Sequence, residues 1–349
     1  MSSPILFDLH EDIALYYYSG EGYGYENDSF DKNLPNRQAD LPKYEKGNVK
    51  LVFSSIFPLM RTFDPEVAGM LSRGYGGLNS AFTSASSKIV AEHLIKIYFQ
   101  LQSKFKDRIK IIEDPEDIEI ILQDSKKLGF LISLEGTESI DDLSDLEIFR
   151  RLGVRSLQFT WNFDTKYAAS CMSAKDYGLT GSGMKLLQVA NEQGIVLDLA
   201  HSSRNTCLEV LEHSDLPVII SHSNVSKVFK HSRNVDDEVL DALKRNGGVI
   251  GFTLIPDTYG KTIPNVSDMV SHIQHVKDNF GSEILAIGTD YFGLFPPDQP
   301  PVGLENISKF ENLWRELLGH GYDVKDVEAL SYKNALRVLE NNAKRWTPN

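Results

Sequence analysis

Residues 195–223, IVLDLAHSSRNTCLEVLEHSDLPVIISHS, contain the clearest indication of the fold. A short apolar run ends at His201, a segment with helical spacing follows, and a second apolar run ends at His222. Short runs rich in isoleucine and valine are typical of buried strands, and apolar residues three and four apart are typical of an amphipathic helix. The stretch therefore predicts a β–α–β unit in which a histidine closes each strand.

The same alternation continues along the rest of the chain. Eight strand candidates alternate with helical segments, at residues 5–10, 48–57, 129–135, 154–160, 195–201, 217–222, 248–254 and 284–290. Repeated β–α units favour a parallel sheet, and eight of them favour a closed (β/α)8 TIM barrel. Residues 16–47 are expected to form a long loop. Because no linker interrupts the 349 residues, we expect a single domain over 1–349.

Composition and charge exclude several classes of function. The formal net charge of −13 gives the chain no electrostatic attraction for nucleic acid or anionic lipid. Two cysteines, Cys171 and Cys207, cannot build a disulfide framework. No segment reaches the roughly 20 apolar residues of a membrane helix, and no signal peptide or lipid anchor is recognisable. We therefore expect a soluble, cytoplasmic protein that binds neither nucleic acid nor membrane.

Residue types that bind metals follow five of the predicted strands. They are His10 and Asp12, Glu135, His201, His222 and Asp290. The carboxyl ends of barrel strands share one face, so these side chains should meet there. Imidazole and carboxylate suit Zn²⁺, with Mn²⁺ or Co²⁺ as substitutes, and a shared carboxylate can bridge two ions. Any one of these motifs alone is more often a solvated or capping group, and only the full set predicts a metal site.

Other motifs are interpreted as structural. GLTGSGMK at 178–185 resembles a phosphate-binding loop, but Met184 stands where that loop needs lysine. GEGYGYE at 20–26 follows no predicted strand, so it is no dinucleotide motif. His272 and His275 lie three apart on a predicted helix and are expected to be a solvated pair. The serines beside His222 belong to no G-x-S-x-G motif.

Taken together, the motifs resemble the membrane (renal) dipeptidase family of zinc metallopeptidases, peptidase family M19, which has an amidohydrolase-like barrel. The resemblance covers nearly the whole chain. It is carried by FDLHEDIA, SLEGTESI, LDLAHSS, PVIISHSNV, KHSRNVDDEVLDALKRNGGVIGF, IGTDYFG and SKFENLWRELLGHGYDVKDVEALSYKNALRV.

The resemblance implies a role for each matching residue. Two Zn²⁺ per chain are implied, one held by His10, Asp12 and Glu135, the other by Glu135, His201 and His222. Arg233 matches the arginine that binds the substrate carboxylate, a role that suits a guanidinium group. Asp290 matches the aspartate that carries a proton to the leaving amine. Family members are often dimers, so a homodimer is also implied as a candidate assembly.

Two positions depart from the family pattern. Renal-type members have a histidine that contacts substrate where this chain has Trp161, which cannot accept a proton or bind a metal. Trp161 followed by asparagine is similar to a pattern of bacterial members, so we interpret the change as a subfamily difference rather than a dead site. We expect Trp161 to contact the substrate. Phe292 stands where the family often has an additional acid.

The resulting hypothesis is a binuclear zinc dipeptidase that hydrolyses the peptide bond of dipeptides through a metal-bridging hydroxide. Two alternatives stay open. One is a related metal-dependent amidohydrolase that acts on N-acyl amino acids or β-lactams. The other is a catalytically silent barrel, which the complete set of candidate ligands disfavours.

Overall fold

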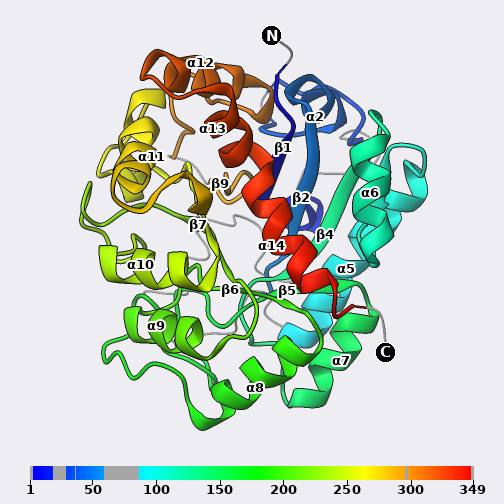
Figure 1. Cartoon of the computed structure of the whole chain (residues 1–349). Helices are drawn as coiled ribbons and strands as arrows, with labels where there is room; N and C mark the ends of the chain where they lie inside the picture. Colours follow the sequence, from blue (N-terminus) through cyan, green and yellow to red (C-terminus); the bar gives the residue numbers. More distant parts are fainter. Residues whose placement is uncertain (1–2, 19–28, 36, 59–85, 295–297, 347–349) are drawn as a thin grey trace.

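A computed structural model describes residues 3–18, 29–35, 37–58, 86–294 and 298–346, and these residues form a parallel barrel (Figure 1). Nine strands pair in the order β2-β1-β9-β8-β7-β6-β5-β4-β3, and pairing of β2 with β4 closes the ring. The strands are β1 (Leu6–Glu11), β2 (Val49–Ile56), β3 (Ile109–Ile111), β4 (Leu128–Leu134), β5 (Val154–Gln158), β6 (Val196–Asp198), β7 (Ile219–Ser223), β8 (Val249–Phe252) and β9 (Leu285–Ile287).

Strand β3 is additional to the eight strands predicted from the sequence. It pairs with the amino-terminal half of β4, where Ile109 lies opposite Leu128, whereas β5 pairs with the carboxyl-terminal half, where Val154 lies opposite Ile132. β3 therefore extends the sheet beside β4 without entering the closed ring. The remaining eight strands form the ring, and the prediction of a (β/α)8 barrel is confirmed.

Helices follow the strands around the outside of the barrel (Figure 1). They are α1 (Ile13–Tyr18), α2 (Leu41–Gly47), α5 (Ser87–Lys104), α6 (Pro115–Gln123), α7 (Leu143–Arg151), α8 (Gly181–Glu192), α9 (Arg204–His213), α10 (Asp237–Asn246), α11 (Val266–Phe280), α12 (Glu311–Gly319), α13 (Val324–Glu328) and α14 (Asn334–Ala343). Reciprocal capping boxes start α6, α7, α11 and α13, and each satisfies backbone N–H groups that the helix itself leaves unpaired. No helix in these described ranges is long and apolar enough to cross a membrane.

The expectation of one long loop over residues 16–47 is wrong in part. Helix α1 reaches into it, and α2 occupies its last seven residues, with Asp40 as the N-cap that accepts the Lys43 N–H. The Asp40–Leu41–Pro42 sequence is a cap followed by an early proline, the signal that favours a helix start here. The GEGYGYE segment lies outside the described residues.

The buried core has two layers, one inside the barrel and one between the strands and the outer helices. Inward side chains such as Phe7, Leu51 and Val249 fill the barrel and belong to one buried cluster with residues of α14, which runs across one end of it in Figure 1. The second layer, between strands and outer helices, contains residues such as Ile220 and Leu240. α14 covers the amino-terminal ends of the strands, where Asn334 donates to the Leu285 carbonyl and Asn342 to the Pro217 carbonyl, so a site can form only at the carboxyl-terminal end.

The expectation of a solvated histidine pair on α11 is wrong for His272. Its side chain is 2% exposed, its Nδ1 accepts the Val225 N–H at 3.1 Å, and the Tyr259 ring packs edge-on against it. His275 lies on the same helix, and its Nε2 is 2.8 Å from Asp237 Oδ1. The three-residue spacing did not reveal that α11 turns His272 towards the barrel.

Replacing His272 with asparagine is expected to make stability less sensitive to acid. Burial lowers the pKa of His272 to about 4, whereas a histidine in an unfolded chain titrates near about 6.5. The unfolded chain therefore takes up the proton first, so stability is full above about pH 6.5 and falls by roughly 3 kcal/mol towards about pH 4. His272→Asn retains an acceptor for the Val225 N–H but has no proton to gain. Urea unfolding at about pH 7.5 and about pH 5 measures the difference, and a fall as large as in the wild type would contradict it.

Candidate metal centre

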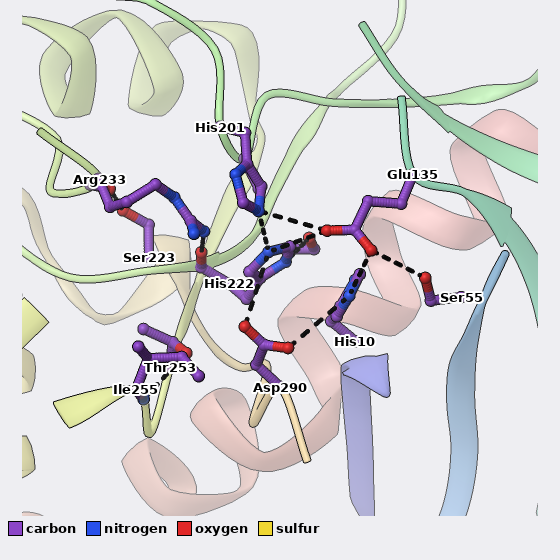
Figure 2. Close-up of polar contacts among 12 residues, drawn as sticks. His10, Ser55, Glu135, His201, His222, Ser223, Arg233, Thr253, Ile255 and Asp290 are labelled. Atoms are coloured by element: carbon purple, nitrogen blue, oxygen red, sulfur yellow. Dashed lines mark hydrogen bonds and ion pairs between the residues drawn. The ribbon is translucent and has the colours of Figure 1, made fainter. Parts of the chain in front are cut away.

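Side chains from strands far apart in sequence converge at the carboxyl end of the barrel (Figure 2). Glu135 directly follows β4, and its two oxygens face different histidines. Its Oε2 lies 3.3 Å from His10 Nε2, and its Oε1 lies 3.3 Å from His201 Nε2 and 3.8 Å from His222 Nε2. One carboxylate therefore contacts imidazoles from three different strand ends.

Asp290 and Asp12 complete the cluster from the β9 and β1 sides. The Asp290 carboxylate lies 4.0 Å from His10 Nε2 through Oδ1 and 4.0 Å from His222 Nε2 through Oδ2. Asp12 Oδ2 lies 3.9 Å from His10 Nε2. The structure thus brings together all six side chains that follow the predicted strands, and all six are buried.

The backbone at the cluster is strained. His201, Asp290 and Phe292 have φ values of 63°, 61° and 68°. Side chains other than glycine seldom adopt this left-handed conformation, and where it persists it is concentrated at functional sites. The strain at His201 and Asp290 falls on two residues of the cluster, which supports a functional role for this end of the barrel.

The two histidines from β6 and β7 are each oriented through their outer nitrogen. His201 Nδ1 lies 2.7 Å from Asn162 Oδ1, and His222 Nδ1 lies 2.7 Å from Ser221 Oγ. Their Nε2 atoms face the centre and lie 2.9 Å from each other. A hydrogen bond to the outer nitrogen fixes the ring and leaves the inner nitrogen to bind a cation, the usual arrangement around a metal ligand.

Opposite charges dominate one half of the cluster. Burial alone would lower the pKa of His10, but the carboxylates of Glu135, Asp12 and Asp290 outweigh it and raise this pKa to about 10. Burial would raise the pKa of Glu135, yet the charge of His10 and the contact with His201 lower it. His10 and Glu135 therefore form a buried ion pair in the absence of metal.

The other half of the cluster favours neutral groups. Burial, with the charge of Arg233, lowers the pKa of His201 to about 3, and burial with the charge of His10 lowers the pKa of His222. Neutral imidazole is the form that binds metal. Burial raises the pKa of Asp290 to about 7. The charges of His10 and Arg233 lower this pKa, and the charge of Glu135 raises it further.

The donor set fits divalent cations. Two overlapping groups, His10 with Glu135 and His222, and His10 with Asp12 and Asp290, hold ligand atoms that lie within 4.8 Å of one another. Nε2 of His10, which faces the carboxylates, and Oδ1 of Asp12 are buried without a hydrogen-bond partner in the described part of the chain. Unpaired buried polar atoms are costly, and coordination of a cation would satisfy them.

Arg233 lies beside the cluster with capacity to bind an anion. The Nη2 atom of Arg233 donates to the His222 carbonyl at 3.0 Å, and the backbone carbonyl of Arg233 accepts from Ser223 Oγ. Its Nε has no hydrogen-bond partner, and among the described residues no carboxylate lies within 4.0 Å of its guanidinium. Arg233 and His201 both line a cavity of about 240 Å³.

Trp161 and Phe292, the two departures from the family pattern, are both at this end of the barrel. The Trp161 ring packs against Phe57 and Phe163, and its centroid lies 5.8 Å from that of His201. Phe292 contacts the Tyr16 ring, with centroids 5.2 Å apart. Trp161 is thus an aromatic wall next to His201, and Phe292 adds an apolar surface rather than a carboxylate.

Sequence reasoning missed the residues that orient the cluster. Asn162 and Ser221 contact the outer nitrogens of His201 and His222, and Ser55 Oγ donates to Glu135 Oε2 at 3.1 Å. Ser221 could have been found because it immediately precedes His222. Asn162 lies in the loop after β5 and Ser55 lies in β2, both far in sequence from their partners, so no local spacing indicates them.

Comparisons with known proteins agree on one family. The sequence model of the family described as "Membrane dipeptidase (Peptidase family M19)" matches residues 1–348. The protein named dipeptidase verJ from Clonostachys rogersoniana is 29% identical over 340 residues, which cover 96% of this chain and 84% of that protein. Dipeptidase 3 from Mus musculus is 35% identical over 226 residues, covering 62% of this chain and 45% of its own length.

Solved structures share the fold. A metallo peptidase from Rhodobacter sphaeroides, liganded with a phosphinate mimic of the dipeptide L-Ala-D-Ala, has a TM-score of 0.83 at 21% identity, with 98% of this chain and 100% of that chain covered. A probable dipeptidase, PvdM from Pseudomonas aeruginosa, has a TM-score of 0.80 at 19% identity, with 98% and 96% covered. At these identities, the two structures show that the chain shares their barrel fold and show nothing beyond the fold.

Proposed function

The chain belongs to the membrane dipeptidase family, peptidase family M19, and from this premise we propose that it is a dipeptidase that uses two zinc ions. The first ion is assigned to His10, Asp12 and Glu135, and the second to Glu135, His201 and His222. When bound, such a pair of ions supplies an activated water molecule and polarises the carbonyl of the scissile peptide bond. Mn²⁺ or Co²⁺ would suit the same ligands.

The observation that carries this proposal is the position of Glu135. Its two oxygens each approach a histidine from a different side of the barrel, His10 at 3.3 Å and His201 at 3.3 Å. A carboxylate whose two oxygens face different imidazoles is suited to join two cations. A site for a single ion would need only one of the two Glu135 oxygens to face a histidine.

Asp290 and Arg233 are proposed to act on the substrate. Asp290 lies 4.0 Å from both His10 and His222, and a carboxylate at such a position can take up a proton and give it back. We assign to it the transfer of a proton to the departing amine. Arg233 offers an unpaired Nε–H beside the cluster, and we assign to it the carboxylate at the end of the dipeptide. Trp161 is proposed to form the wall that the substrate side chain contacts.

Hydrolysis of dipeptides by the zinc-loaded protein tests the proposal. The assay compares L-L and L-D dipeptides with N-acyl amino acids, a β-lactam and a tripeptide amide that lacks a free carboxylate. We expect turnover of the dipeptides and loss of that turnover when a chelator removes the metal. Turnover of the N-acyl amino acids or the β-lactam alone would favour an amidohydrolase with other substrates. No turnover of any substrate by protein with bound zinc would favour a silent barrel.

Replacing Arg233 with alanine is expected to raise KM by about 100-fold and to change kcat little. The proposed contact is to a part of the substrate that does not react, and a charge-assisted hydrogen bond to a carboxylate contributes about 1.5–3 kcal/mol. Steady-state kinetics on one dipeptide measure both constants. Arg204→Ala is the matched control, because Arg204 is an exposed arginine that lines the same cavity and pairs with Asp236. An unchanged KM in Arg233→Ala would contradict the assignment.

A further inference from the structure

Between Asp8 and Glu11, strand β1 contains one more residue than the paired segment of β2. Asp8 lies opposite Val52 and Glu11 opposite Ser54, so three steps along β1 match two steps along β2. This is the pattern of a β-bulge, which reverses the side to which the following side chains point. Phe7 and Leu9 pack inside the barrel, so strict alternation would turn His10 outward. Instead, His10 reaches Glu135 in the barrel mouth.

Strand β7 repeats the same irregularity. Ile220 lies opposite Ile250 and Ser223 opposite Phe252, so again three steps match two. Ile219 packs inside the barrel and Ile220 outside it, and alternation would place His222 on the outer side. His222 instead stacks near His10, with ring centroids 3.9 Å apart. By contrast, β4 pairs with β2 step for step from Gly129 to Leu134. Leu131 packs inside the barrel, and Glu135 is four residues further on, so Glu135 points inward without a bulge in this pairing.

A buried aspartate holds the backbone at each bulge. Asp8 Oδ1 accepts the His10 N–H at 3.2 Å and the Thr289 N–H at 2.8 Å, and Oδ2 accepts from Thr289 Oγ1 at 2.6 Å. Asp8 therefore fixes the residue in the β1 bulge and the residue that precedes Asp290. The Asp8 side chain is fully buried.

Asp198 does the same for β7. Its Oδ1 accepts the Ser221 N–H at 2.9 Å, inside the β7 bulge, and the Ala200 N–H at 3.0 Å. These two N–H groups immediately precede His222 and His201. Asp198 is also fully buried, and its other oxygen has no hydrogen-bond partner in the described part of the chain.

Two glycines make room for the β7 bulge. A Cβ atom at Gly251 would lie 2.0 Å from the Ser221 carbonyl oxygen, and one at Gly288 would lie 1.7 Å from it. No side chain can occupy either position while the Ser221 carbonyl stays where it is. The β7 bulge therefore depends on glycine in β8 and just after β9.

We propose that Asp8 and Asp198 are positioning residues, each of which holds a β-bulge that turns a histidine, His10 or His222, into the barrel mouth. The inference deepens the proposed function and rests on it for the role of the two histidines. Neither aspartate belongs to the two groups of candidate metal ligands. Each acts through backbone N–H groups, so its effect is on the aim of the histidines.

Asp198 gives the sharper test, because both backbone N–H groups that it holds donate to one oxygen. Asp198→Asn retains that acceptor and should retain wild-type kcat, zinc content and Co²⁺ absorption spectrum. Asp198→Ala removes it and should lower kcat by about 10- to 100-fold, the range for residues that support metal ligands, and shift the Co²⁺ spectrum. Asp117→Ala is the matched control, since Asp117 is buried and one of its oxygens accepts the Glu113 and Asp114 N–H groups at the start of α6. It should lower Tm and leave kcat and the spectrum unchanged.

The outcomes separate this inference from the proposed function. Wild-type kcat and spectrum in folded Asp198→Ala would overturn it, as would equal losses in the asparagine and alanine variants. If Asp198→Ala does not fold, Thr289→Val tests the β1 bulge, with an expected fall of about tenfold in kcat at constant KM. Unchanged kcat in Thr289→Val would overturn the inference in that case. Absence of metal binding and turnover in the wild type would contradict the proposed function instead.

Discussion

Replacing His222 with alanine is expected to lower kcat for dipeptide hydrolysis by more than about a thousandfold. His222 Nε2 lies 3.8 Å from Glu135 Oε1 and 2.9 Å from His201 Nε2, so its loss removes one of three proposed ligands to the second ion. The first ion keeps His10, Asp12 and Glu135. Zinc content should therefore fall from two ions to about one per chain, as measured on dialysed protein.

The fold should survive this substitution. His222 lies at the end of β7, and the hydrogen bonds of its backbone do not depend on its ring. His213→Ala, an exposed histidine at the end of α9, is the matched control and should change neither zinc content nor kcat. Retained zinc content and activity in His222→Ala, with a wild-type far-UV CD spectrum, would refute the assignment of His222.

Replacing Glu135 with glutamine is expected to have the largest effect of any single change. The substitution preserves shape but removes the negative charge that both proposed sites share, so both ions should bind weakly and kcat should fall by more than about a thousandfold. A second consequence needs no metal. Glu135 is the strongest of the carboxylates that raise the pKa of His10, so this pKa should fall in the metal-free variant. NMR titration of the imidazole signals measures that change.

Glu138→Gln is the matched control for Glu135→Gln. Burial, with repulsion by Glu135, raises the pKa of Glu138 to about 8 despite an opposing backbone hydrogen bond. Glu138 is therefore mostly protonated at neutral pH, and glutamine resembles that neutral form. Its substitution should leave zinc content and kcat unchanged. Two ions per chain and normal turnover in Glu135→Gln would contradict the bridging role.

The sequence was sufficient to predict the family and the barrel. The β–α–β unit at 195–223 and its repetition identify a closed barrel, and the structure confirms it. The family predicted from the ordered motifs is also confirmed, and with it the assignment to the metallo-dipeptidases at the level of the family. Apolar strand runs are readable from sequence, which is why Glu135 could be placed at the carboxyl end of the strand predicted at 129–135.

The features that the sequence did not reveal depend on tertiary contacts. The bulges at His10 and His222 break the alternation that strand prediction relies on, and they depend on partners distant in sequence, such as Thr289 for Asp8. The burial of His272 depends on which face of α11 meets the barrel. The bulges and the burial of His272 depend on packing between elements, which the residue spacing within one element cannot predict.

Stepwise addition of zinc to the metal-free wild-type protein, with dipeptide turnover measured at each step, tests the central claim most directly. The claim is that Glu135 joins two ions into one catalytic site. We expect turnover to rise with added zinc and to reach its maximum only when two ions are bound per chain. Full turnover with one bound ion, or no turnover with two, would contradict it.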